Sequence, residues 1–308
     1  MKKVKVLIFI ICIVLTGCST GRTEKDINYT DNDKNNYKQL LPKAQSDDSI
    51  IIYNHWLSHL LSYDMRNEQI EEEIKEDNYC QYNFNKKSKY YTAGFTPNSN
   101  YRIIRLDGNE INTVVEMDSG QGVFPLATDG KRHFFVIEGD SMESYKIVEL
   151  EDQSLIEYPK AKGLVVGGAL LDNKLYYTHY EENDDSHSLY KLDIEKKSNE
   201  PELILVGLSD SEVYSYNGEI YVTNKGKISS INNEKKYYES KSINFFDEEN
   251  DILVQIEVQG IDLILQIVDC YTKEIIGTAM DPLDFDINNK EVTAYCKNDI
   301  ITIDLRGQ

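Results

Sequence analysis

The sequence has 308 residues, of which 40% are hydrophobic, and carries a formal net charge of −20 from 33 basic and 53 acidic residues. The hydrophobic fraction is sufficient for a folded core but too low for several membrane spans. A chain this acidic is repelled by nucleic-acid phosphates, so no nucleic-acid partner is expected, and its six prolines are too few for Pro-rich linkers.

The first 18 residues have the pattern of an export signal. Lys2, Lys3 and Lys5 precede an apolar run, Val6 to Leu15, which is too short to span a membrane as a helix. The segment Leu15-Thr16-Gly17-Cys18 that follows resembles the lipobox of bacterial lipoproteins. This resemblance implies cleavage before Cys18 and acyl chains on its sulfur and on the new N-terminus, which are enough for stable anchoring to the membrane. The alternative is an ordinary secretory signal with a chance cysteine.

The expected organisation is a signal peptide at 1–17, a flexible polar tether at 18–36 and one folded domain at 37–308. The tether is so poor in apolar residues that it cannot bury enough surface to offset its ordering entropy. The lipobox resemblance implies a protein on the outer face of the bacterial cell membrane. Because Ser19 follows Cys18 where an Asp would retain the protein, the outer membrane of a two-membrane cell is also possible.

From about residue 50 onward, strand-like segments recur. The clearest is a hairpin, residues 173–178 and 188–193, in which apolar and polar residues alternate. Segments of this kind begin near Ile50, Lys89, His133, Lys174, Glu219, Ile252 and Glu291. Their spacing centres on roughly 40 residues, the period of four-stranded propeller blades. Turn residues such as Asp129-Gly130 and Asn217-Gly218 separate them from further apolar segments.

This pattern resembles the β-propeller superfamily over residues 38 to 305, by period rather than by a WD40 or kelch motif. The predicted fold is all-β, a propeller of seven four-stranded antiparallel blades, with six or eight blades as alternatives. A pair of β-sandwiches is the alternative fold. The last blade would lack its fourth strand, which residues 37–41 could supply. Residues 68–76 are predicted to form the outer strand of the first blade, although a short helix also fits them.

Three cysteines follow Cys18, namely Cys80, Cys270 and Cys296. An odd number allows at most one disulfide, for which Cys270 and Cys296 in the last two units are better placed. Three small buried core residues fit the sequence equally well. The absence of a Cys-x-x-Cys pair excludes a zinc ribbon and a thioredoxin-like redox site.

The histidines give two candidate sites. His55 and His59 lie four residues apart beside Trp56, but the sequence offers no further ligands, so they are interpreted as polar loop residues. His179 and His187 flank an acidic loop that is longer than a tight turn requires. We expect this loop to contact a cation or a basic partner through Glu181, Glu182, Asp184 and Asp185. The run from 247 to 251 is a similar but weaker candidate.

No other motif carries chemistry. Residues 139–142 (Gly-Asp-Ser-Met) superficially match the GDSL hydrolase motif, but no histidine follows His187 to complete it. There is no nucleophile elbow and no phosphate-binding loop. No catalytic residue, cofactor or metal is therefore predicted.

The predicted function is that of a membrane-anchored extracytoplasmic lipoprotein whose propeller binds a protein, peptide or glycan without catalysis. One alternative is an enzyme acting on extracellular glycan or peptide, with carboxylates drawn from different blades. Another is a sensor or immunity lipoprotein. Convergence of two or more acids within ~10 Å at a channel mouth would favour the enzyme.

Overall fold

The computed structural model describes residues 49–54, 59–74, 80–82, 89–94, 100–107, 110–138, 145–158, 164–181, 183–196 and 200–306. Cys18, the predicted tether, residues 37–41, His55, Trp56, residues 139–142 and Glu182 lie outside these ranges. Within the ranges every regular element is a strand, and none of the described residues forms a helix that could cross a membrane.

The strands form seven antiparallel sheets, each from a continuous part of the chain, and we number these sheets as blades 1 to 7. Blade 1 contains β1 (Ser49–Asn54), β2 (His59–Asp64) and β3 (Gln69–Ile74); blade 2 contains β4 (Cys80–Tyr82), β5 (Tyr90–Ala93), β6 (Arg102–Asp107) and β7 (Glu110–Glu116). Blade 3 contains β8 (Gly122–Thr128), β9 (His133–Glu138), β10 (Lys146–Glu151) and β11 (Ser154–Glu157); blade 4 contains β12 (Leu164–Leu171), β13 (Lys174–Glu181), β14 (Ser186–Asp193) and β15 (Glu202–Leu208). Blade 5 contains β16 (Val213–Tyr216), β17 (Glu219–Asn224), β18 (Lys227–Ser230) and β19 (Asn233–Glu239); blade 6 contains β20 (Ile243–Asp247), β21 (Ile252–Gln259), β22 (Asp262–Asp269) and β23 (Ile275–Met280). Blade 7 contains β24 (Pro282–Asn288), β25 (Glu291–Cys296) and β26 (Ile300–Asp304).

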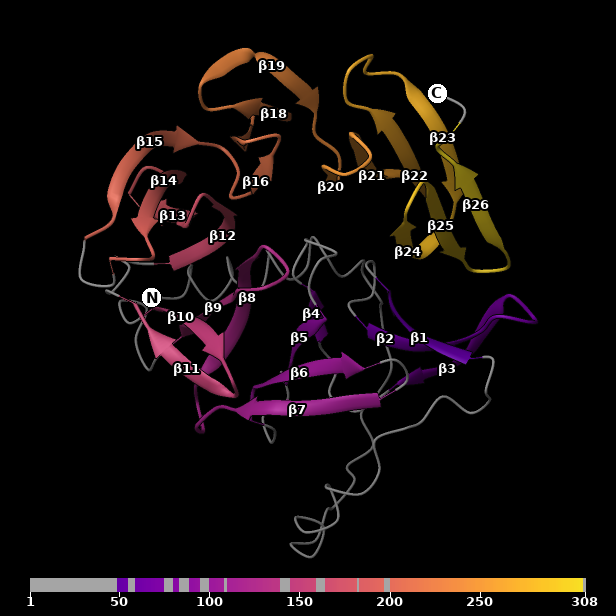
Figure 1. Cartoon of the computed structure of the whole chain (residues 1–308), viewed down its shortest axis with the longest axis horizontal. Coiled ribbons are helices and arrows are strands. Elements are labelled where there is room, and N and C mark those ends of the chain that lie inside the picture. The colour runs from indigo at the N-terminus through magenta and orange to yellow at the C-terminus, as the bar shows by residue number, and fades with distance from the viewer. Residues whose placement is uncertain are drawn as a thin grey trace, which may run out of the picture.

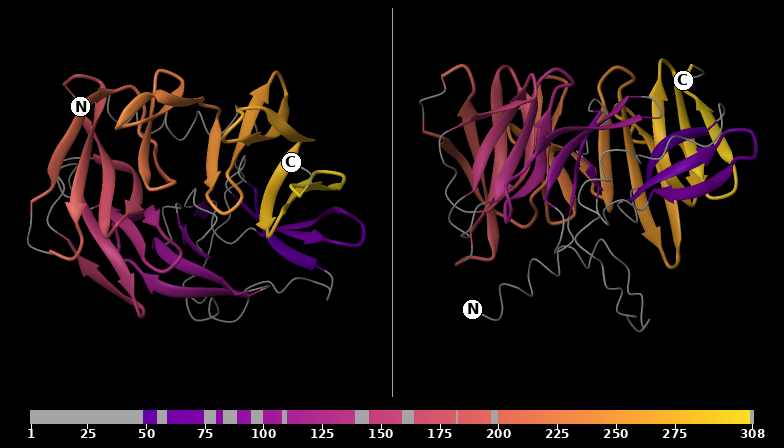
Figure 2. Two further views of the ribbon diagram at one scale, coloured as in Figure 1. Left: turned by 45° about the horizontal axis from the view of Figure 1, so that its top comes forward. Right: turned by 90° about the horizontal axis from the view of Figure 1, so that it is seen from below.

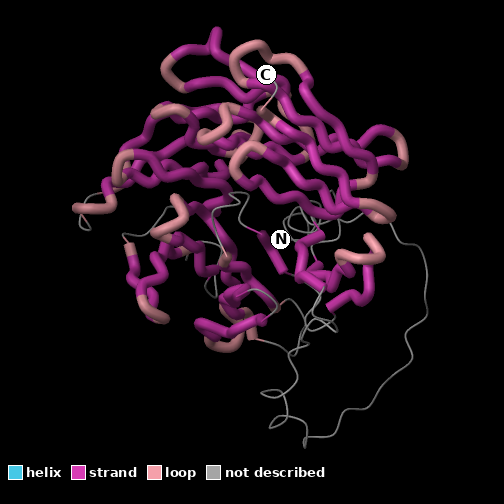
Figure 3. The backbone as a smooth tube through the Cα atoms, turned by 45° about the vertical axis from the view of Figure 1, so that its right-hand side comes forward, coloured by secondary structure: helices cyan, strands magenta, loops and turns pink. Residues whose placement is uncertain are grey.

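The blades are arranged in a ring, and in blades 2 to 7 the first strand lies nearest the central axis (Figure 1). Neighbouring blades touch around the whole circle, through the contacts β2–β4, β4–β8, β8–β12, β12–β16, β16–β20, β22–β24 and β24–β1. Figure 2 shows the same ring from two further directions, and Figure 3 shows strands joined by turns and loops throughout. The chain is a seven-bladed β-propeller. The predicted fold class and the predicted number of blades are confirmed.

The core lies between blades rather than within them. Because successive side chains of a strand point to opposite faces of the sheet, each blade contributes to two neighbouring cores. In β13, Leu175 and Tyr177 pack with Phe134 of blade 3, whereas Tyr176 between them packs with Val213 of blade 5. This alternation explains why the strands carry apolar residues on both faces.

The junction between blades 7 and 1 joins the two ends of the propeller. The Tyr63 hydroxyl donates hydrogen bonds to the backbone carbonyls of Cys296 (3.0 Å) and Asp299 (3.1 Å). The backbone N–H of Tyr53 donates to the buried carboxylate of Asp284 at 3.0 Å. The buried side chains packed across the junction are Ile52, Leu61, Tyr63, Leu283 and Tyr295. Polar and apolar contacts together therefore close the ring.

The predicted strand starts differ from the structure in one systematic way. Six of the seven starts, from Lys89 onward, coincide with the second strand of a blade, and only Ile50 lies in a first strand. The prediction thus missed the innermost strands. The strand predicted at residues 68–76 is confirmed as β3, which lies at the edge of the described blade 1 sheet. A fourth strand for blade 7 from residues 37–41 stays a prediction.

The two described cysteine side chains are free and buried. Cys270 packs in the core between blades 5 and 6, whereas Cys296 packs in the core between blades 6 and 7. Burial raises the pKa of Cys270 to about 11 and that of Cys296 to about 12. A disulfide between them is therefore not formed, and the alternative of buried core thiols is correct for this pair.

Candidate functional site

The acidic loop expected to contact a partner is the turn between β13 and β14, at one end of blade 4. The strands pair up to Glu181 and Ser186, and the backbone N–H of Asp184 donates to the Glu181 carbonyl at 3.2 Å. The Tyr180 hydroxyl donates to the Asp185 carboxylate at 2.7 Å. Asp184 and Asp185 are exposed and Glu181 is half-buried. Three of the four predicted acids thus lie at this turn, with Glu181 as the last residue of β13, and Glu182 is outside the described residues. The prediction of a long loop was wrong, because the strands continue to Glu181 and Ser186 and leave only four residues between them.

A second loop, Ser209 to Glu212, lies beside this turn and leads from blade 4 into blade 5. The register pairs His187 with Leu208, which places the end of β15 next to the start of β14. The Ser209 hydroxyl accepts a hydrogen bond from the Lys225 backbone N–H at 2.6 Å and donates to Asp210 at 2.7 Å. The two acidic loops therefore belong to the same end of the ring.

Two residues of blade 4, Gly167 and Thr178, also fix the position of this second loop. The Thr178 hydroxyl donates to the backbone carbonyl of Ser211 at 2.6 Å and accepts from the N–H of Gly167 at 3.1 Å. A Cβ added to Gly167 would lie 2.1 Å from the Ser211 carbonyl oxygen. Since no side chain fits there, a glycine is required for this close approach.

His179 and His187 point to opposite faces of blade 4, toward blades 3 and 5 respectively, because their strand partners place them in alternate positions. Burial lowers the pKa of both rings, although Glu181 raises that of His179 and Asp210 and Asp185 raise that of His187. In this part of the structure the buried Nδ1 atoms of both rings have no hydrogen-bond partner. Burial thus favours neutral imidazoles, which supply no full positive charge to the neighbouring acids.

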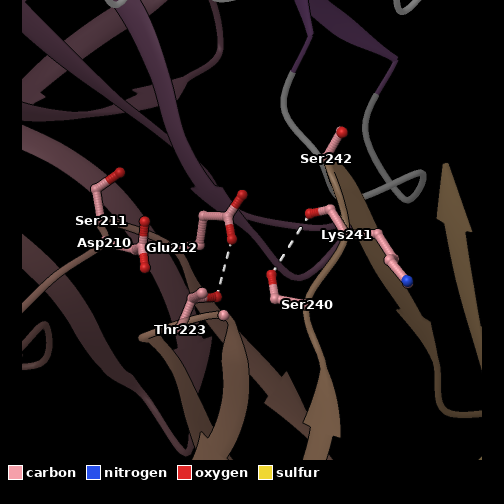
Figure 4. A pocket seen from close by; sticks show the side chains of 8 residues that line it. Asp210, Ser211, Glu212, Thr223, Ser240, Lys241 and Ser242 are labelled. Atoms are coloured by element: carbon pink, nitrogen blue, oxygen red, sulfur yellow. Dashed lines mark hydrogen bonds between the residues drawn. The ribbon is translucent and has the colours of Figure 1, made fainter. Parts of the chain in front are cut away.

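A pocket of about 310 Å³ opens where blades 5 and 6 begin (Figure 4). Its lining is polar and comes from three loops and one strand. The lining residues are Asp210, Ser211, Glu212, Thr223, Gly226, Ser240, Lys241 and Ser242. The pocket thus continues from the acidic turns of blade 4 toward blade 6.

Glu212 is the half-buried carboxylate of this pocket. The Thr223 hydroxyl donates to its Oε2 at 2.8 Å, and the Thr223 backbone N–H donates to its carbonyl at 3.1 Å. Burial raises the pKa of Glu212, while hydrogen bonds from Thr223 and Tyr214 lower it and the nearby Asp210 raises it further. Both side-chain donors are neutral hydroxyl groups. None of the described basic side chains forms an ion pair with Asp210 or Glu212.

The opposite wall of the pocket is fixed by an amide network. Asn244 Oδ1 accepts from the backbone N–H of Lys241 at 2.9 Å and from Gln255 Nε2 at 2.7 Å. Asn244 Nδ2 donates to the Lys241 carbonyl at 2.9 Å. The Lys241 ammonium forms an ion pair with Glu257 at 2.8 Å, and Figure 4 shows it turned away from Glu212. The lysine therefore leaves the two pocket carboxylates uncompensated.

We call Glu181, Asp184, Asp185, Asp210 and Glu212 the acidic rim. The exposed Lys225 in the adjacent β17–β18 turn offsets one of these five charges. Over the described ranges, no group of three His, Cys, Asp or Glu side chains is placed to hold a metal ion. The arrangement can accept hydrogen bonds and bind positive charge.

The weaker acidic candidate, residues 247 to 251, has structural roles at the other end of the ring. Asp247 accepts a hydrogen bond from the Asn250 side chain at 2.6 Å, and Asp251 accepts one from the Tyr216 hydroxyl at 3.0 Å. Of the other histidine pair, His59 is the first residue of β2 and His55 lies outside the described residues.

Sequence reasoning missed Asp210 and Glu212. The available signal was the run Ser209-Asp210-Ser211-Glu212, in which hydroxyl and carboxyl side chains alternate between two apolar segments. Its partners in the pocket, Thr223 and Lys241, lie on the next blade and beyond, so only the ring geometry brings them together.

No protein-family model and no curated protein matches the sequence. Among solved structures, the chain is similar to apo AztD from Citrobacter koseri, with 11% identity, 84% of this chain and 92% of that chain covered, and a TM-score of 0.50. What is shared is the fold. At such low identity the likeness shows nothing about the ligand.

Two further solved structures are similar at a TM-score of 0.49. The uncharacterized protein lmo1340 from Listeria monocytogenes EGD-e is 13% identical, with 84% of this chain and 91% of that chain covered. TolB from Acinetobacter baumannii is 14% identical, with 72% of this chain covered. The chain spans only 60% of the length of TolB.

Proposed function

We propose that this protein is a lipid-anchored extracytoplasmic propeller that binds a positively charged segment of a protein or peptide at its acidic rim. The anchor is Cys18, and the location is the outer face of the bacterial cell membrane. The observation that supports the binding function is that, within the described part of the chain, no lysine or arginine forms an ion pair with a rim carboxylate. Only the His179 ring lies near one, with its Nδ1 atom 3.4 Å from Glu181, and burial lowers the pKa of that ring. Exposed acids gathered on a rigid scaffold attract basic partners over long distances and bind them by charge.

An enzyme acting on glycan is less well supported, although two acids do converge. Asp210 and Glu212 line one pocket, and the raised pKa of Glu212 is a property that general acids share. However, the two acids belong to one loop and lie on one wall of the pocket, opposite Ser240 and Lys241 (Figure 4). Glycosidase carboxylates flank the scissile bond from two sides. The pocket lining therefore supports binding.

The binding function is tested with the full mature chain and two labelled peptides of equal length, one rich in lysine and one rich in glutamate. We expect the lysine-rich peptide alone to bind, with an affinity that falls as NaCl concentration rises. The double variant Asp184→Asn, Asp185→Asn should weaken this binding by roughly tenfold. A matched control, Glu248→Gln with Glu249→Gln, removes two charges from the turn at the other end of the ring and should leave binding unchanged. Equal binding of both peptides would overturn the proposal.

The anchor is tested separately by fractionation of cells that express Cys18→Ser. We expect the wild-type protein in the membrane fraction and labelled by palmitate, and the variant unlabelled and released from the membrane. A variant that stays in the membrane fraction would contradict lipid attachment at this residue.

A further inference from the structure

The charge balance of the Glu212 pocket indicates what kind of group it lacks. Two carboxylates, Asp210 and Glu212, line the pocket, and its one lining cation, Lys241, is paired with Glu257 outside it. Removal of a carboxylate from water is unfavourable unless a cation or several donors compensate it. The Thr223 and Tyr214 hydroxyls compensate Glu212 only in part. A ligand that carries one positive charge would complete the site.

The other lining groups narrow the chemistry of that ligand. Ser211 and Ser242 have hydroxyl groups at the pocket, and these can accept hydrogen bonds as the carboxylates do. No aromatic side chain lines the pocket, so it has no face for a quaternary ammonium, which binds through cation–π contacts. A primary ammonium offers three donors that can point to separate oxygen atoms. The lining suits this group best.

The size and rigidity of the pocket are consistent with one side chain as the occupant. Its volume of about 310 Å³ is at the small end of ligand pockets. The Thr178–Ser211 hydrogen bond holds one wall, and the Asn244–Gln255 hydrogen bond supports the other. A site held in this way loses little entropy when it binds its ligand.

From these observations we infer that the pocket binds a primary ammonium group, such as the end of a lysine side chain, with Glu212 as its anionic anchor. This inference rests on the proposed function and specifies which atoms of the basic partner the rim recognises. The exposed acids of blade 4 attract the partner, and Glu212 receives one of its ammonium groups. Asp210, which lines the same pocket, is a further acceptor for that group.

The test compares three peptides of one length, which contain lysine, Nε-acetyl-lysine or arginine, with the free sugar N-acetylglucosamine as a neutral ligand. We expect the lysine peptide to bind the full mature chain roughly tenfold or more tightly than the acetyl-lysine peptide. Glu212→Gln should abolish this difference. The matched control Glu219→Gln, which removes a carboxylate paired with Lys236 away from the pocket, should preserve it.

A second variant tests the role of Lys241. Glu257→Gln removes the carboxylate that holds this ammonium at 2.8 Å, so Lys241 becomes a competitor for the pocket. We expect weaker binding of the lysine peptide in this variant. Unchanged binding would count against a single-cation site.

The outcomes separate this inference from the proposed function. If no basic peptide binds, the proposed function fails. If the lysine peptide depends on Asp184 and Asp185 but not on Glu212, the function stands and the ammonium pocket is wrong. Tighter binding of the arginine peptide or of the sugar would also overturn the inference. The control is the unfolding temperature of Glu212→Gln. If it equals that of the wild type, a loss of binding in this variant is not caused by a loss of folding.

Discussion

The junction between blades 7 and 1 and the acidic rim both contain a carboxylate away from bulk water, but they compensate it differently. Asp284 at the junction accepts hydrogen bonds from the backbone N–H groups of Tyr53 (3.0 Å) and Phe285 (2.8 Å). Glu212 at the rim accepts from hydroxyl groups, and burial raises its pKa. Internal hydrogen bonds to Asp284 thus stabilise the ring at the junction, whereas the rim carboxylates remain able to bind a positively charged ligand.

The largest loss of stability is expected for Tyr63→Ala at the junction. Tyr63 is 0% exposed and donates to two carbonyls of blade 7. Its truncation should lower the free energy of unfolding by about 3–5 kcal/mol, and Tyr63→Phe by about 1–2 kcal/mol because only the hydroxyl is lost. Chemical denaturation measures both. Tyr271→Phe, at a position that is 71% exposed, is the control. If Tyr63→Ala has the same free energy of unfolding as the wild type, the contacts of Tyr63 at the junction contribute no stability.

Gly167→Ala should affect stability and the rim together. The new methyl group would lie 2.1 Å from the Ser211 carbonyl oxygen, so the loop from Ser209 to Glu212 must move. We expect a loss of about 1–3 kcal/mol in the free energy of unfolding, together with weaker binding of the lysine-rich peptide. Thr178→Val removes the hydrogen bond to Ser211 without crowding and should cost about 1 kcal/mol. If Gly167→Ala binds the lysine-rich peptide as tightly as the wild type, the position of the loop from Ser209 to Glu212 is not needed for binding.

The matched amide substitutions Asp284→Asn and Glu212→Gln compare the two carboxylates directly. Asp284→Asn replaces one acceptor oxygen by a donor beside the buried N–H groups and should lower the free energy of unfolding by about 1–3 kcal/mol. Glu212→Gln removes a carboxylate that has no cationic partner. It should change the free energy of unfolding by less than about 0.5 kcal/mol and weaken binding of the lysine peptide. Equal destabilisation by both would remove the distinction between the two regions.

Stability is also expected to depend on pH. Burial lowers the pKa of His133, His179 and His187, so below the ordinary histidine pKa of about 6.5 the unfolded chain binds more protons than the folded chain. Their contribution to stability is complete above that pH and is lost as the pH falls, by at most about 1.4 kcal/mol per pH unit for each ring. Burial raises the pKa values of Glu138 and Glu212, and this acts in the opposite direction as the pH rises above the ordinary glutamate pKa.

Thermal unfolding between pH 8 and pH 5 measures the histidine effect. His179→Gln and His187→Gln should each make the unfolding temperature less dependent on pH than in the wild type. If the unfolding temperature depends on pH equally in the wild type and the variants, these two rings do not take up protons when the chain unfolds.

The sequence predicted well those strands that alternate with clear turns. The hairpin of β13 and β14 was predicted at residues 173–178 and 188–193, because Leu175, Tyr177 and their polar neighbours alternate after a turn signal; the structure extends both strands toward the turn, to Glu181 and Ser186. The inner strands were missed because they are packed closely by neighbouring blades and contain residues that weaken a strand pattern, such as Pro125 in β8 and Gly167 and Gly168 in β12. The two glycines allow close contacts with Ser211 and Leu126 that form only when neighbouring blades are in place.

The site was predictable only in part. The charge of the turn around Asp184 and Asp185 marked one half of the acidic rim, although this turn is shorter than predicted. The other half, Asp210 and Glu212, depends on the pairing of His187 with Leu208 and on the approach of blade 6, neither of which has a local signal. A loop between two strands can be located from sequence, but its neighbours across blades cannot.

The Tyr63 hydrogen bonds at the junction also have a consequence for how the chain folds. They join residues 233 and 236 positions apart, whereas the Thr178–Ser211 bond spans 33 positions. Each doubling of a loop costs about 0.6 kcal/mol in closure entropy, so this last connection costs about 2 kcal/mol more than a neighbouring one. Blades can assemble one after another along the chain as soon as their own residues are available. We expect the circle to close last, and the seam between its first and final sheets to open first under mechanical or chemical stress.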